Sequence, residues 1–385
     1  MELSTKRIFY VVLAILAVEY FPLPGGFSLF RVVVAPLCVI GTLLLLSRRY
    51  SIGQWAGLAV ISMLWLLGTA TALHASSTAS LATTLGVVLF LVFVYLHLAT
   101  YRVDRTVVTI VALFSLPHFI TLVLFWIGLS NEAYTDLPYR FDGLHRDPNF
   151  MCIYVLVSFV AKLVLIRKSG LTVRCLLYLG IAADLAMTML SVSRGGVLAF
   201  GVAVLAWLYL TVNRKSLVVA APIAAAALFA MPTVLPAALS TSFSPVQQVI
   251  YRFTSTNLAS SEDNIRLYIW DRAIDSIRES GLIFGYSLDR FVAQFGRFPH
   301  NTFIDACLEA GLIGGLLLVA IVLVTSIVMF RPKNRPRGYA LLVPMMCVVI
   351  WSTTIFLSFY QTKLFWLVLV MAVAYVTRGR TSVEK

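Results

Sequence analysis

The stretch PHNTFIDACLEAGLIGGLLLVAIVLVTSIVMF, residues 299–330, decides the fold class. From 304 onward it is longer than the ~20 apolar residues that a helix needs to cross a bilayer, and apolar runs of about 15–23 residues recur along the chain. The chain is 60% hydrophobic and 12% charged, with a mean hydropathy of +0.91. Too little polar surface is present to cover a soluble globule, so we expect an all-α, polytopic bundle of membrane helices.

Polar interruptions divide the apolar runs into about twelve transmembrane helices within one integral membrane domain, 1–385. The five cysteines are scattered singly, without the spacing of a zinc site or a disulfide framework, so we expect them to serve in packing. The predicted spans lie near 8–21, 29–46, 55–73, 79–99, 106–129, 147–166, 175–190, 197–212, 216–231, 304–330, 338–357 and 364–376.

Basic residues in the short loops predict the orientation, because cytoplasmic loops collect Lys and Arg. Alternate connections, such as Arg48-Arg49 and Arg214-Lys215, are basic together with both termini. We therefore expect a bacterial inner-membrane protein with both termini in the cytoplasm. A large periplasmic loop, 232–303, then separates the ninth and tenth spans, and apolar residues at helical spacing over 262–280 predict an amphipathic helix within it.

Arginine supplies nearly all of the basic residues on the predicted outer side. Its planar guanidinium matches phosphate oxygens two at a time, whereas lysine is a point charge. The outer side is therefore expected to bind an anionic, phosphate-bearing substrate. The arginines concerned are Arg31, Arg140, Arg146, Arg194, Arg252, Arg266, Arg272, Arg278, Arg290 and Arg297.

Three outer segments contain the side chains suited to chemistry. The first, 140–149, mixes cations, carboxylates and His145, and Pro148 suits the first turn of the span that follows. The second, 191–196, is a short turn whose glycines let backbone amides approach an anion beside Arg194. The third, 299–315, places His300 at a helix N-terminus, where a neutral imidazole can act as a general base.

These segments resemble the O-antigen ligase and Wzy-type polymerase superfamily over most of the region 140–330. The combination of a His-Asn pair and Glu-x-Gly-x-x-Gly after a long outer loop is fairly specific, whereas Ser-x-Ser-Arg-Gly alone is a weak signal. The matching elements are GLHRDPN at 143–149, SVSRGG at 191–196, Arg266 with Trp270, LIFGY at 282–286, His300-Asn301 and EAGLIG at 309–314.

The resemblance implies a metal-independent, inverting glycosyltransferase of the GT-C type that uses an undecaprenyl-diphosphate-linked oligosaccharide as donor. We expect Arg194 and Arg266 to bind the diphosphate and His300 to activate the acceptor hydroxyl, because fixed cations must meet the charge that grows on the leaving group. The expected substrate-binding residues are Arg140, Arg146, Asn149, Arg290, Asn301 and Glu309.

The expected partners are the lipid-linked donor, an acceptor that is either another glycan or lipid A core, membrane lipids and a chain-length regulator. We expect no cofactor, no metal and no nucleic acid. The sequence favours a polymerase over a ligase only weakly, because nothing in it marks a pocket for lipid A core.

Two other interpretations stay open at this point. Glu19 lies where related enzyme families bind a metal, although no Asp-x-Asp pair accompanies it. A twelve-span transporter of lipid-linked glycans would also be apolar throughout, but such folds have repeated halves and mid-membrane charges. Here the large outer loop has no counterpart in the first half of the chain.

Overall fold

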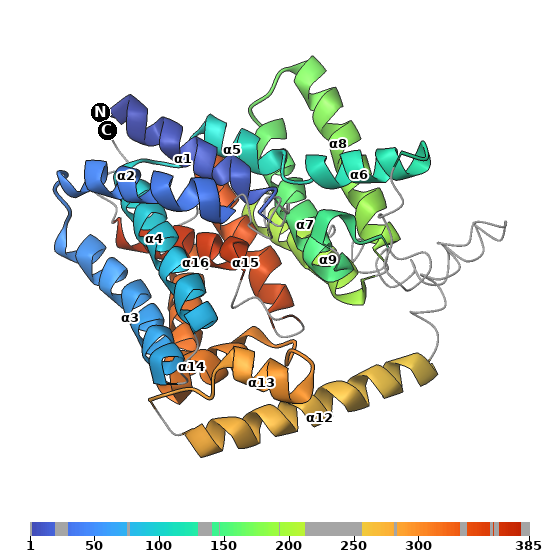
Figure 1. The fold of residues 1–385 in the computed structure, drawn as a ribbon. Helices are drawn as coiled ribbons and strands as arrows, with labels where there is room; N and C mark the ends of the chain where they lie inside the picture. Colours follow the sequence, from blue (N-terminus) through green and yellow to red (C-terminus); the bar gives the residue numbers. More distant parts are fainter. Residues whose placement is uncertain are drawn as a thin grey trace. The chain divides into compact units, whose positions relative to one another are not determined.

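The computed structural model describes residues 2–19, 30–74, 78–129, 141–145, 147–191, 193–211, 256–280, 283–331, 337–354, 357 and 362–378. The regular elements in these ranges are all helices, which confirms the predicted all-α class (Figure 1). The chain divides into two compact units. Unit 1 contains Met1–Val103, Asp263–Pro336 and Thr354–Lys385, and unit 2 contains Asp104–Glu262 and Arg337–Thr353.

Unit 1 is organised around α16, whose residues are buried along almost its whole length. This helix contacts α3, α4 and α14, and α14 also packs along α3. A helix buried on all sides must be apolar on all sides, which is why α16 has no polar face. The unit contains α1 (Glu2–Leu16), the π-helix η1 (Phe30–Val34), α2 (Ala35–Leu46), α3 (Ile52–His74), α4 (Thr78–Thr100), α13 (Leu288–Phe295), α14 (Thr302–Phe330), α16 (Lys363–Thr377) and most of α12 (Thr256–Ser280).

Unit 2 is organised in the same way around α7, which contacts α5, α8, α9 and α15. A buried ion pair joins two of these helices, since Lys162 Nζ on α7 lies 2.6 Å from Asp184 Oδ2 on α8. The unit contains α5 (Arg105–Ala112), α6 (Leu116–Trp126), the 3₁₀ helix η2 (Gly143–His145), α7 (Pro148–Ile166), α8 (Leu171–Leu190), α9 (Arg194–Thr211), the 3₁₀ helix η4 (Gly338–Leu341) and α15 (Leu342–Thr353).

Five helical stretches of the described chain are long and apolar enough to cross a membrane. The outward face of α14 shows the matching pattern, because Leu316, Leu323 and Ile327 are large, apolar and more than half exposed. Such a surface suits lipid rather than water. The five stretches are Ile52–Thr71, Arg105–Trp126, Pro148–Ile166, Leu171–Leu190 and Thr302–Phe330.

The predicted spans each overlap a described helix, except the one at 216–231, which lies outside the described residues. The first part of the predicted outer loop, up to 255, also lies outside them. A helix, α12, covers the segment 262–280 that was predicted to be amphipathic, but it begins at Thr256 rather than at 262. The helix extends further than predicted because Thr256–Ser261 contains neither Pro nor Gly, and nothing in that segment therefore interrupts a helix.

Candidate functional site

The first predicted segment forms the N-terminus of α7. Asp147 is the N-cap, and its Oδ1 accepts hydrogen bonds from the backbone N–H groups of Asn149 at 2.7 Å and Phe150 at 3.4 Å. Pro148 occupies the first turn, as predicted, where its missing N–H costs nothing. The cap fixes the direction in which the chain enters the helix.

The second predicted segment is joined to the first by a hydrogen bond between side chains. Ser193 Oγ donates to Asn149 Oδ1 at 2.8 Å and accepts from the N–H of Gly196 at 3.1 Å, so Ser193 caps α9 while binding α7. A Cβ on Gly196 would lie 2.2 Å from Cys152 Sγ, which shows how closely the two helices approach. Arg194, the first residue of α9, therefore lies where the N-termini of two helices meet, a setting that favours anions.

His118 supports the same region from α6. Its side chain is fully buried, and Nδ1 accepts a 3.4 Å hydrogen bond from the N–H of Leu144 in η2. Gly143 has φ +58°, and a Cβ on it would lie 2.6 Å from His118 Nδ1. The contacts of His118 with Leu144 and Gly143 therefore position the turn before α7.

The third predicted segment holds His300 between two anchors in unit 1. Trp270 Nε1 on α12 donates a 2.7 Å hydrogen bond to the carbonyl oxygen of Pro299. Asn301 is the N-cap of α14, and its Oδ1 accepts from the N–H groups of Phe303 at 3.0 Å and Ile304 at 3.2 Å. His300 lies between them with φ +55°, a left-handed conformation uncommon outside glycine.

Arg266 lies on the same helix as the first of these anchors. It is half-buried and precedes Trp270 by one turn of α12, so both residues are on one face of that helix. Trp270 binds the segment that carries His300, so α12 carries Arg266 one turn from the residue that anchors this segment.

The loop before α13 docks against a bend in α14. The bend is at Ala310 and Gly311, whose backbone angles are not helical. It frees the carbonyl oxygen of Leu308, which accepts a 2.9 Å hydrogen bond from the N–H of Ser287. Glu309 Oε2 accepts from the N–H of Leu288, also at 2.9 Å, so this predicted substrate-binding residue has a structural task.

The remaining predicted residues are distributed as follows. Arg290 is exposed on α13, with its guanidinium carbon 4.4 Å from the centre of the Tyr286 ring. Arg140 and Arg146 lie outside the described residues. Asn149 and Arg194 belong to unit 2, whereas Arg266, Arg290, His300, Asn301 and Glu309 belong to unit 1. The predicted residues therefore fall into two groups, one within each unit.

Glu19, the alternative metal ligand, is buried in unit 1 with its Oε2 3.6 Å from Lys363 Nζ. A carboxylate that faces an ammonium group is a poor ligand for a metal ion, because the metal ion and the ammonium group would then be two positive charges side by side. Within the described ranges, no three His, Cys, Asp or Glu side chains are grouped as metal ligands.

Comparison with protein families finds a match over part of the chain. The family described as O-antigen ligase matches residues 179–319, a region that contains Arg194, Arg266, His300 and Glu309. This match confirms the resemblance to the O-antigen ligase and Wzy-type superfamily. Asn149 and the segment before it lie outside the matched region. No curated protein matches the chain.

Proposed function

We propose, from the similarity of residues 179–319 to the O-antigen ligase family, that this membrane protein is a metal-independent, inverting glycosyltransferase. It moves a glycan from undecaprenyl diphosphate to a hydroxyl group at the periplasmic face of the inner membrane. The donor's anomeric C–O bond breaks and its electron pair leaves with the diphosphate. The acceptor oxygen attacks from the opposite face and forms the new glycosidic bond.

The observation that carries this proposal is the backbone of His300. A left-handed φ of +55° is retained because Pro299 and Asn301 are both anchored, and strain of this kind is typical of functional sites. In the reaction the imidazole of His300 accepts the proton of the attacking hydroxyl. Asn301 keeps that imidazole in place through its cap.

The arginines supply the countercharge for the leaving group. Arg266 on α12 and Arg194 at the N-terminus of α9 bind the diphosphate. At the N-terminus of α9 the helix dipole adds to the positive charge of Arg194. Fixed cations stabilise charge that develops in a transition state without any reorganisation during the reaction. Arg140, Arg146 and Arg290 assist in binding the donor.

The acceptor decides between two versions of this function. A polymerase, our first choice, transfers the glycan to another lipid-linked repeat, and a ligase transfers it to lipid A core. The family match, whose description is O-antigen ligase, is compatible with either acceptor. The donor chemistry is the same for both.

The test is glycan transfer by the purified protein in lipid nanodiscs, with undecaprenyl-diphosphate repeat units, with or without lipid A core, and with EDTA. His300→Gly removes the imidazole while accepting the left-handed backbone, and we expect transfer to fall about 10²–10⁴-fold and to recover partly with added imidazole. Arg266→Ala should also lose transfer, whereas Arg297→Ala, at an exposed arginine of the same unit, should not.

Each outcome of this assay has a definite meaning. A ladder from lipid-linked repeats alone indicates a polymerase, and transfer only with lipid A core indicates a ligase. Full activity of His300→Gly without imidazole would remove the general base from the mechanism. No transfer to either acceptor would favour a transporter of lipid-linked glycans.

A further inference from the structure

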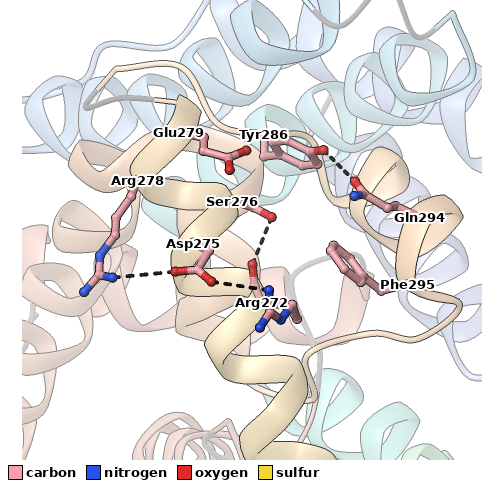
Figure 2. A pocket seen from close by; sticks show the side chains of 8 residues that line it. All are labelled: Arg272, Asp275, Ser276, Arg278, Glu279, Tyr286, Gln294 and Phe295. Atoms are coloured by element: carbon pink, nitrogen blue, oxygen red, sulfur yellow. Dashed lines mark hydrogen bonds and ion pairs between the residues drawn. The ribbon is translucent and has the colours of Figure 1, made fainter.

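A cavity of about 370 Å³ lies between α12 and α13 in unit 1 (Figure 2). One wall is a single face of α12, because Arg272, Asp275, Ser276 and Glu279 follow each other at helical spacing. The opposite wall consists of Tyr286, Gln294 and Phe295. The volume falls near the lower end of the ~300–1,000 Å³ range of small-ligand sites.

The cavity's charged side chains balance one another. Asp275 forms ion pairs with Arg272 at 3.7 Å and with Arg278 at 3.6 Å, and Glu279 adds a second carboxylate to the lining. Two cations therefore face two anions. A phosphate would meet arginines that already have a countercharge, and an acyl chain would leave these charged groups without water.

The opposite wall combines an oriented amide with aromatic surface. Tyr286 Oη donates a 2.6 Å hydrogen bond to Gln294 Oε1, which leaves the amide's NH₂ group as the donor directed elsewhere. Phe295 points from α13 toward α12 in Figure 2 and lines the same space. Carboxylates, guanidinium groups, an amide and an aromatic ring suit a ligand that has many hydroxyl groups and apolar C–H faces.

The cavity shares the helix α12 with the residue that anchors the segment of the proposed catalytic histidine. Trp270, which binds Pro299 beside His300, precedes Asp275 by five residues of α12, or about 7.5 Å of helix axis. A sugar chain that occupies this cavity would thus lie beside the helix that positions the base.

We infer that this cavity binds an uncharged saccharide segment of the glycan, remote from the bond that reacts. The inference rests on the proposed function, and it adds a site that recognises the sugar itself rather than the diphosphate. Gln294 and the two carboxylates bind hydroxyl groups, and Phe295 contacts a C–H face.

The test measures binding without catalysis. The probe is the repeat-unit oligosaccharide released by mild acid from the lipid-linked donor, so that it has no diphosphate, and its Kd is measured by saturation-transfer NMR on the protein in nanodiscs. We expect Gln294→Ala to raise Kd about tenfold, the effect of losing one or two hydrogen bonds. Tyr286→Phe, which only releases the amide, should raise Kd by a smaller factor.

Asp271→Asn is the matched control, because Asp271 is exposed on α12 but does not line the cavity, and its Kd should equal that of the wild type. His300→Gly should bind the probe normally while losing transfer. In the transfer assay Gln294→Ala should raise KM for the glycan and leave kcat unchanged. Inorganic pyrophosphate should not displace the probe.

The inference is overturned if the wild type does not bind the probe, if Gln294→Ala and Tyr286→Phe both bind it as the wild type does, or if pyrophosphate displaces it. In each of these cases transfer that depends on His300 can still be measured, so the proposed function stands or falls separately. Unchanged circular dichroism of the variants shows that they remain folded.

Discussion

Gly285→Ala should disrupt the docking of the loop onto the bend of α14. A Cβ on Gly285 would lie 1.9 Å from the carbonyl oxygen of Leu308, 2.6 Å from its carbonyl carbon and 3.0 Å from that of Glu309. These are backbone atoms, which cannot rotate away as a flexible side chain does. Since non-bonded carbon atoms prefer ~3.5–4.0 Å, the loop must withdraw by about 1.5 Å.

Such a shift breaks the hydrogen bonds of the loop, because it takes 2.8–2.9 Å contacts beyond the usual upper limit of ~3.2 Å. Each bond contributes about 0.5–1.5 kcal/mol, so the docked state loses about 1.5–4.5 kcal/mol. The three bonds run from the N–H groups of Gly285, Ser287 and Leu288 to Thr71 Oγ1, Leu308 O and Glu309 Oε2.

Hydrogen exchange, read by mass spectrometry on peptides from 283–300 in nanodiscs, measures this local loss directly. A loss of about 1.4 kcal/mol corresponds to a tenfold change, so exchange in Gly285→Ala should be at least ten times faster than in the wild type. Gly86→Ala is the matched control in the same unit, because a Cβ there meets nothing within 4 Å. Equal exchange rates in Gly285→Ala and the wild type would refute the docking argument.

Three further predictions test contacts elsewhere in the two units. His118→Phe leaves the N–H of Leu144 without its acceptor, so thermal unfolding in detergent should show a loss of about 1–3 kcal/mol; an unchanged midpoint would contradict this. Lys162→Met removes the ion-pair partner of the buried carboxylate of Asp184 and should lower the free energy of unfolding by about 3–5 kcal/mol. In a double-mutant cycle, the double variant with Asp184→Leu should regain most of that free energy. Asn301→Ala removes the cap of α14, which should lower the free energy of unfolding by about 1 kcal/mol and also lower kcat. Asn301→Ser should restore the stability if capping is the role of Asn301.

The helices could be predicted because their signals are local. The N-terminus of α7 follows from an Asp before a Pro, and the part of α14 after its bend follows from the uncharged, largely apolar run 310–330. In lipid the backbone N–H and C=O groups have no water to bond, so a single apolar run that is long enough crosses the membrane as a helix rather than as a strand or loop. The amphipathic spacing over α12 is a local signal of the same kind.

The contacts that hold the two groups of predicted residues could not be predicted in the same way. Lys162 appeared in the sequence only as an isolated cation within an apolar run, and its partner, Asp184, is contributed by the next helix. The pairing of Ser193 with Asn149 spans 44 residues, and that of Gly285 with Thr71 spans 214. No periodicity encodes such pairs, because they depend on which helices pack together. The cavity between α12 and α13 was missed for this reason too, whereas α13 itself has apolar residues at helical spacing that could have predicted it.

The strongest argument for a chemical role of His300 comes from what a glycine would do at the same position. A left-handed backbone is accessible to glycine without cost, whereas other residues with such strained angles lose about 1–3 kcal/mol and keep them only where their surroundings impose the conformation. Those surroundings are present, since Trp270 binds the residue before His300 and Asn301 caps the helix after it. Stability alone would favour glycine between these anchors. We therefore propose that histidine stands at this position for its imidazole, and that the two anchors hold its backbone in place.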